Sequence, residues 1–149
     1  MDGDILFFHA DFGHTIEEYI EHYPDTGMFV CLTNRITAKP QLYSAETLSI
    51  DSIRYFFLVA NNLRRQNHLR TTPVNEPVAG FLMVIRRSTW DLIREKVECE
   101  VIDKHFLHVD YAIARSILSL GKSIMRMDSL LVFHYYRFVE GNPHWRGLS

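Results

Sequence analysis

A chain of 149 residues, 47% hydrophobic and 23% charged, is long enough to bury a core and too apolar to be disordered. Its formal net charge of −2 argues against a protein that binds nucleic acid through bulk positive charge. No stretch approaches the roughly 18 uncharged apolar residues of a membrane span. Cys31 and Cys99 lack CxxC spacing, so we expect buried thiols and one soluble, cytoplasmic domain over 1–149.

Apolar runs and helical periodicity alternate along the chain. The runs predict strands at 4–8, 28–32, 78–85, 123–125 and 130–136. The periodic segments predict helices over 16–21, 51–66, 88–97 and 109–120. Long loops are expected over 33–49 and 67–77. This order, with strands that read as buried and parallel, predicts an α/β protein with an open mixed sheet and flanking helices.

Helix boundaries are signalled in two places. Thr15 and Glu18 have the spacing of a capping box, which predicts that the first helix begins at Thr15. Gly121 follows the last predicted helix and suits a left-handed C-cap.

Histidine and aspartate interrupt or follow the apolar runs. His9 and Asp11 follow the first predicted strand, where residues two apart share a face. His134 lies within the last one, where a polar side chain needs a partner. Imidazole and carboxylate both bind divalent cations, so these three residues are candidate metal ligands. The alternative for each histidine is a hydrogen-bonded core residue.

Asp110 opens the predicted helix 109–120. It is either a first-turn acid stabilised by the helix dipole or a carboxylate at the mouth of a pocket, able to act as a general base.

Two segments carry a family resemblance on the N-terminal side. The run DGDILFFHAD at 2–11 resembles the D-x-D strand of the inverting family-two glycosyltransferases of the A fold. In this comparison His9 replaces the first Asp and Asp11 matches the second. The run AGFLMVIRRSTW at 79–90 is similar to the acceptor-side segment of that family.

Two further segments extend the resemblance toward the C-terminus. The stretch from Asp110 to Gly121 is similar to the E-D motif, whose Asp starts a helix, although Val109 replaces the usual Glu. The run FHYYR at 133–137 resembles a segment that supplies a His to the metal.

The resemblance implies a truncated glycosyltransferase A fold and a hexosyltransferase-type activity. A sugar would pass from a nucleoside-diphosphate donor to a hydroxyl of a glycan or another acceptor, with Asp110 as the base. The resemblance assigns Mn²⁺ or Mg²⁺ to Asp11, His134 and His9. Because imidazole replaces a carboxylate, Mn²⁺ is expected to be held better than Mg²⁺.

The resemblance also suggests residues that contact the substrates. Ala79 and Gly80 would let the backbone approach the sugar closely. Arg137 and Trp90 are further candidates for substrate binding, although a core position is the stronger expectation for Trp90.

The usual nucleotide-binding start of the family, V-S-V-I-I-P-x-Y-N, has no counterpart. We expect the later half of a longer enzyme, a compact variant, or a fold that has lost activity. An uncovered sheet edge would then favour a homodimer. Two other functions stay open, namely an inactive binding module and a small metal-dependent hydrolase that uses His9, Asp11, Asp110 and His134.

Overall fold

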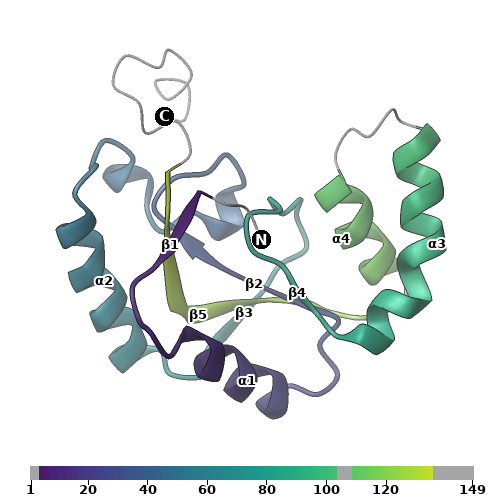
Figure 1. Ribbon diagram of the computed structural model, residues 1–149, viewed down its shortest axis with the longest axis horizontal. Coiled ribbons are helices and arrows are strands. Elements are labelled where there is room, and N and C mark those ends of the chain that lie inside the picture. The colour runs from purple at the N-terminus through teal and green to yellow at the C-terminus, as the bar shows by residue number, and fades with distance from the viewer. Residues whose placement is uncertain (1–3, 104–108, 136–149) are drawn as a thin grey trace.

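The structure is a computed structural model that describes residues 4–103 and 109–135 (Figure 1). Its described strands form a mixed sheet, curled and open, with helices around it, which confirms the predicted fold class. In chain order the elements are β1 (Ile5–Phe7), α1 (Phe12–His22), β2 (Met28–Thr33), η1 (Lys39–Gln41), η2 (Ala45–Thr47), α2 (Ile53–Gln66), β3 (Thr71–Pro73), β4 (Val84–Ile85), α3 (Arg87–Asp103), α4 (Val109–Ser119) and β5 (Ile124–His134).

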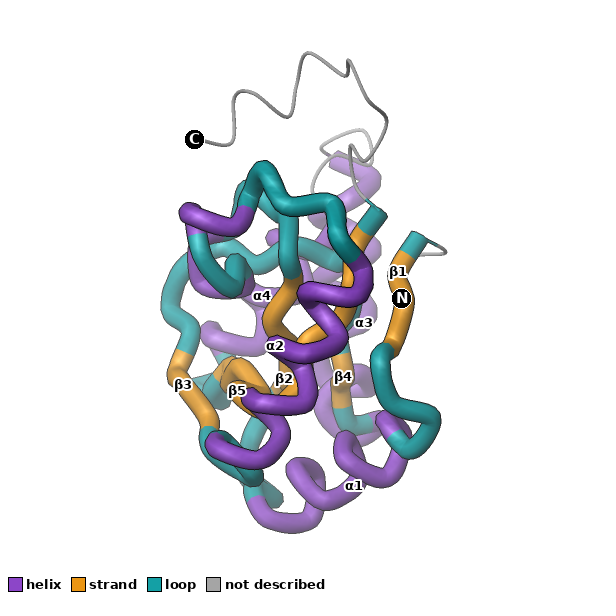
Figure 2. Tube along the Cα trace, turned by 90° about the vertical axis from the view of Figure 1, so that its left-hand side faces the viewer, coloured by secondary structure: helices purple, strands orange, loops and turns teal. Residues whose placement is uncertain are grey.

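Strand β5 organises the sheet because three other strands pair with it. It runs parallel to β2 and antiparallel to β3 and β1. On the edge that faces away from β2, β5 pairs first with β3, at Met125–Met127, and then with β1, at Val132–His134. β4 extends the sheet beyond β2 in the antiparallel sense. Figure 2 shows β1 at one side of the molecule, with no described strand beyond it.

A bulge divides β5 into these two parts. Cys31 of β2 lies opposite Met127, but the next residue, Leu32, lies opposite Leu131. The three residues at 128–130 are therefore additional to the parallel register, and they change the neighbour of β5 from β3 to β1. The sequence predicts two short strands here, whereas the structure has one long strand interrupted by this bulge.

The core lies on both faces of β2, whose six residues are all buried. Met28 and Val30 pack in the cluster that α3 and α4 cover, whereas Phe29 and Cys31 pack in the cluster that α1 covers. A third cluster places Phe56 and Ala60 of α2 against β5. Figure 1 shows α2 on one side of the sheet strands and α3 with α4 on the other side of the view. Burial raises the pKa of the Cys31 thiol.

Several predicted boundaries are wrong near the N-terminus. β1 is antiparallel and half-buried rather than a buried parallel strand. α1 begins at Phe12, one turn earlier than predicted, and Thr15 is buried within it. The Phe12 ring stacks on Phe7 with 3.6 Å between ring centroids, and this contact fixes the first helical turn next to β1.

The middle of the chain also differs from the prediction. Strand β3 lies inside the predicted loop 67–77, and only Val84–Ile85 of the predicted strand 78–85 pairs with the sheet. Cys99 is exposed, contrary to the prediction of two buried thiols. By contrast, Gly121 has the expected positive φ, at 71°.

The long loop after β2 has its own order. Buried Arg35 donates to the backbone oxygen of Leu48 at 3.2 Å and forms an ion pair with Asp51. This guanidinium therefore holds the two ends of the loop together while η1 and η2 occupy its middle. Within the described ranges, no helix combines the length and apolar character needed to cross a bilayer.

We predict that Gly27→Ala destabilises the fold by about 1–3 kcal/mol, because a methyl group would overpack a filled site. An added Cβ would lie 2.6 Å from Ile117 Cγ2 and 2.8 Å from Lys122 Cβ. Urea denaturation measures the free energy of unfolding. Gly13→Ala is the matched control, because no atom lies within 4 Å of its added Cβ. Equal losses for both variants would contradict the packing argument.

Candidate functional site

The two segments that resemble the acceptor-side and base motifs meet in the structure. Asp110 lies in the first turn of α4, and its Oδ2 accepts a hydrogen bond from the Gly80 N–H at 3.1 Å. The preceding residue, Ala79, is held by Gln41, whose side chain donates to the Ala79 oxygen at 3.2 Å and accepts from the Ala79 N–H at 2.6 Å. Buried Gln41 comes from η1, so two distant segments, η1 and α4, fix this backbone.

Gly80 has a structural use that sequence reasoning missed. A Cβ built on Gly80 would lie 3.2 Å from Asp110 Cβ, closer than ordinary van der Waals contact. The absent side chain therefore lets α4 approach the 79–80 backbone. Gly80 therefore lies against Asp110, and its expected contact with a sugar stays a prediction.

A hollow of about 250 Å³ opens beside this contact. Asp110 is half-buried at its wall, where a carboxylate can accept a proton from a bound hydroxyl group. The residues that line the hollow are Thr37, Ala38, Pro77, Val78, Ala79, Asp110 and Tyr111.

A second, smaller hollow of about 120 Å³ shares Pro77 and Tyr111 with the first. Arg115 also lines it and stacks over the Tyr111 ring, with its guanidinium carbon 5.3 Å from the ring centroid. Glu100 of α3 forms an ion pair with Arg115. This pair gives the guanidinium a fixed place on one face of the ring.

His134 is a buried and well-partnered residue at the end of β5, with 3% of its surface exposed. The backbone N–H of His134 donates to Asn34 Oδ1 at 2.7 Å, and its ring Nδ1 lies 3.3 Å from the Arg35 backbone oxygen. Its Nε2 lies 3.3 Å from Asp4 Oδ2. The ring also stacks on Phe81, with 5.3 Å between centroids. Since Phe81 follows Gly80, the histidine lies close to the segment that contacts Asp110.

His9 and Asp11 lie at the other end of β1 from His134. In the β1–β5 register Ile5 is opposite His134, and the chain then runs away from it. β1 ends at Phe7, so His9 and Asp11 follow the end of β1 that is away from His134. The structure therefore does not bring the three candidate ligands together. The described part of the chain contains no group of three or more His, Cys, Asp or Glu side chains that suits a metal ion.

Asp11 has a different partner, the Arg64 side chain of α2. Two parallel hydrogen bonds join them, at 2.8 Å from Nη1 to Oδ1 and at 2.5 Å from Nη2 to Oδ2. These hydrogen bonds lower the pKa of the Asp11 carboxyl group. Burial, followed by the nearby Arg64 charge, lowers the pKa of His9. The ion pair between Asp11 and Arg64 therefore joins the start of α1 to α2 at a half-exposed site.

Trp90 is not among the residues that line the hollow. Half-buried Trp90 packs against the apolar cluster of α3 and α4. It thus has the core position that was the stronger expectation for it. Arg137 lies outside the described residues.

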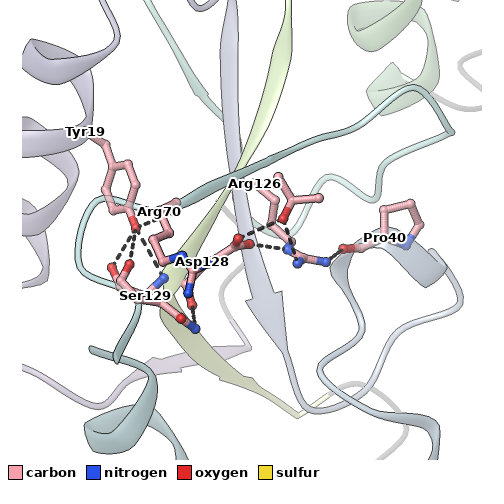
Figure 3. A network of polar contacts seen from close by, with 8 residues as sticks. Tyr19, Pro40, Arg70, Arg126, Asp128 and Ser129 are labelled. Atoms are coloured by element: carbon pink, nitrogen blue, oxygen red, sulfur yellow. Dashed lines mark hydrogen bonds and ion pairs between the residues drawn. The ribbon is translucent and has the colours of Figure 1, made fainter. Parts of the chain in front are cut away.

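A polar network at the bulge of β5 was missed by sequence reasoning (Figure 3). Arg126 donates to Asp128 Oδ1 at 2.8 Å and to the Pro40 oxygen at 2.6 Å, while Thr72 donates to Asp128 Oδ2 at 2.7 Å. The signal in the sequence is a pair of opposite charges two residues apart inside an apolar run. A hollow of about 380 Å³ lies beside Arg126, lined also by Lys39, Pro40, Thr72, Pro73, Val74, Asn75 and Glu76.

The other half of this network surrounds the buried Tyr19 hydroxyl group. It donates to the Arg70 oxygen at 3.0 Å, and it also lies 2.8 Å from Ser129 Oγ. The Ser129 N–H donates back to it at 3.2 Å. Burial raises the pKa of Tyr19. One hydroxyl group therefore joins α1, the start of β3 and the bulge of β5, as Figure 3 shows.

Comparisons of the chain with known protein families, with curated proteins and with solved structures find no match. The site provides a carboxylate held by a backbone N–H, a neighbouring hollow, and an exposed tyrosine ring at the border of the hollow.

We predict that Tyr19→Phe lowers the free energy of unfolding by about 1–3 kcal/mol, because the change leaves buried hydrogen-bonding groups of Ser129 without this partner. Urea denaturation is the measurement. Tyr55→Phe, on the exposed side of α2, removes the same hydroxyl group and should have little effect. A loss of similar size in both variants would show that the network adds nothing.

We predict that Arg64→Gln raises the pKa of Asp11 toward its ordinary value, because the hydrogen bonds that favour the carboxylate are lost. Carboxyl-carbon NMR titration measures it. Since the folded-state pKa is lowered, the stabilisation is present above the ordinary value near pH 4 and is lost as the pH falls through the folded-state pKa. Arg65→Gln, which changes the neighbouring arginine, should leave the Asp11 titration unchanged. An unchanged titration in Arg64→Gln would contradict the assignment.

Proposed function

We propose that this chain is a glycosyltransferase-like domain that transfers a sugar from a nucleoside-diphosphate donor to a hydroxyl acceptor. One observation carries the proposal. The segments that resemble the acceptor-side and base motifs are 30 residues apart in sequence, yet Gly80 and Asp110 are joined by a hydrogen bond beside a hollow. If the two segments resembled the family motifs only by chance, nothing would require them to be in contact.

In the proposed reaction the acceptor hydroxyl group lies in the hollow with its proton toward Asp110. The hydroxyl oxygen forms a bond to the anomeric carbon, and the bond from that carbon to the diphosphate oxygen breaks. The electron pair of the broken bond leaves with the diphosphate, and the proton passes to the Asp110 carboxylate. The Gly80 N–H fixes the carboxylate through Oδ2.

The residues proposed to hold Mn²⁺ or Mg²⁺ do not fit one ion in this arrangement. His9 and Asp11 lie at the opposite end of β1 from His134, and Asp11 is paired with Arg64. No step is therefore assigned to a metal here. Metal dependence stays a prediction of the resemblance, and donor turnover with and without added Mn²⁺ tests it.

A second candidate function is an inactive module of the same fold that binds a glycan, a nucleotide or a protein. The ion pair between Asp11 and Arg64 favours it, because the carboxylate that the resemblance assigns to the metal has another partner. The hydrolase alternative needs His9 and His134 in one cluster, and the structure separates them along β1.

A homodimer is proposed as a further property of this fold. Among the described strands β1 pairs with β5 alone, so its other edge adjoins no described strand. Leu6, in the middle of β1, is 36% exposed. Sedimentation measurements on the whole chain test this state.

We predict that Asp110→Asn lowers sugar transfer by about 10²- to 10⁴-fold, because the amide cannot take the acceptor proton. Nucleoside-diphosphate release, measured with a panel of donor sugars and acceptors, gives the rates. The Asn Oδ1 can still accept from the Gly80 N–H, so the melting temperature should change little. Asp25→Asn, in the exposed turn after α1, is the matched control and should keep full activity.

Full transfer by Asp110→Asn would contradict the role of this residue. Absence of donor turnover in the unchanged protein, with retained ligand binding, would identify the inactive module instead.

A further inference from the structure

The hollow beside Asp110 is the first of three that follow one segment of the chain, residues 72–79. It shares Pro77 and Tyr111 with the second hollow. The second shares Asn75 and Glu76 with the third, which lies beside Arg126. Shared lining residues place the three hollows next to one another along this segment.

The sizes of the hollows bear on the length of the ligand. The volumes of about 250 and 120 Å³ are each below the roughly 300–1,000 Å³ of typical small-molecule sites. Taken together across Tyr111, the two hollows enter that range. A ligand that fills this site therefore spans both hollows, with the tyrosine ring between its ends.

The charges of the first two hollows indicate an uncharged ligand. Asp110 places a carboxylate in the first hollow and Glu76 places one in the second. The described cation among their lining residues is Arg115, and its guanidinium pairs with Glu100 and stacks on Tyr111. Among the residues that line these two hollows, no uncommitted cation offsets the carboxylates, so they disfavour an acidic ligand, whereas hydroxyl groups can bind them.

The surface of Tyr111 suits a sugar ring. This side chain is 41% exposed, and it borders both hollows. Arg115 covers part of the ring, which holds it in one orientation. An aromatic ring with a fixed orientation presents apolar area at a low cost in conformational entropy.

We infer that the acceptor is a neutral oligosaccharide of at least two units that lies across Tyr111, with the reacting unit beside Asp110. The placement of the reacting unit rests on the proposed function. The next unit lies in the hollow of Asn75 and Glu76, and the third hollow has room for another.

The test is a ¹⁵N NMR titration of the whole chain with neutral gluco-, cello-, malto- and chito-saccharides of one to three units. In at least one series the disaccharide should bind about tenfold more tightly than its monosaccharide, a difference of about 1.4 kcal/mol. Digalacturonic acid, an acidic disaccharide, should show no such gain. Tyr111→Ala should remove the gain from the second unit, while Tyr111→Phe should keep it.

Tyr55→Ala is the matched control, since Tyr55 is 38% exposed on a different helix and should not affect the titrations. Melting temperatures of the variants show whether a lost gain comes from unfolding. Equal affinities for one and two units in every series would overturn the inference. An acidic disaccharide as the tightest ligand, or an unchanged gain in Tyr111→Ala, would also overturn it.

The binding test separates this inference from the proposed function. Disaccharide binding that depends on Tyr111, without transfer from any donor, would support the inference and contradict the proposed transferase activity. Transfer to monosaccharides as efficient as transfer to disaccharides would support the enzyme and remove the inference.

Discussion

The pairing of β5 with three other strands is the constraint on which the rest of the structure depends. A strand has two edges, so β5 can have three neighbours only if one edge is divided between two of them. The bulge at 128–130 makes this division, with β3 before it and β1 after it. Within the bulge, the Asp128 N–H donates to the Arg70 oxygen and the Ser129 N–H donates to the Tyr19 hydroxyl group, and these hydrogen bonds stabilise the interruption.

The candidate site has a similar origin, because its geometry comes from contacts between segments far apart in sequence. Gln41 of η1 fixes Ala79, and Asp110 of α4 fixes Gly80, so neither the loop nor the helix determines the site alone. A carboxylate that is held by a backbone N–H is already oriented before a ligand binds. This arrangement reduces the entropy that would be lost in ordering the group during a reaction.

The elements that could be predicted are those whose signal is local. The buried run of β2 and the extent of the helix α2 were found because burial and periodicity are visible in single segments. Strand β3 was missed because Thr71–Pro73 is short, polar and paired only through β5. The start of α1 was missed because the capping pattern at Thr15 is a local signal, whereas the ring contact between Phe7 and Phe12 is seen only in the folded structure.

For the site, the sequence identified Asp110 and Gly80 as separate candidates, but the backbone hydrogen bond between them is a long-range contact without a local signal. By contrast, the sequence grouped His9 with His134, and the structure does not bring them together. Both residues lie next to apolar runs, but only the antiparallel register of β1 and β5 shows that they lie at different ends of the strand.

The central position of β5 also bears on how the chain folds during synthesis. β1 and β3 each find their described strand partner only in β5, which follows every other described element in the chain. At about 5–20 residues per second, the ribosome releases the apolar residues of β1 many seconds before their partner emerges. The sheet is thus rich in contacts between distant residues, a property that slows folding and lengthens the time during which unpaired strand edges are exposed to other chains.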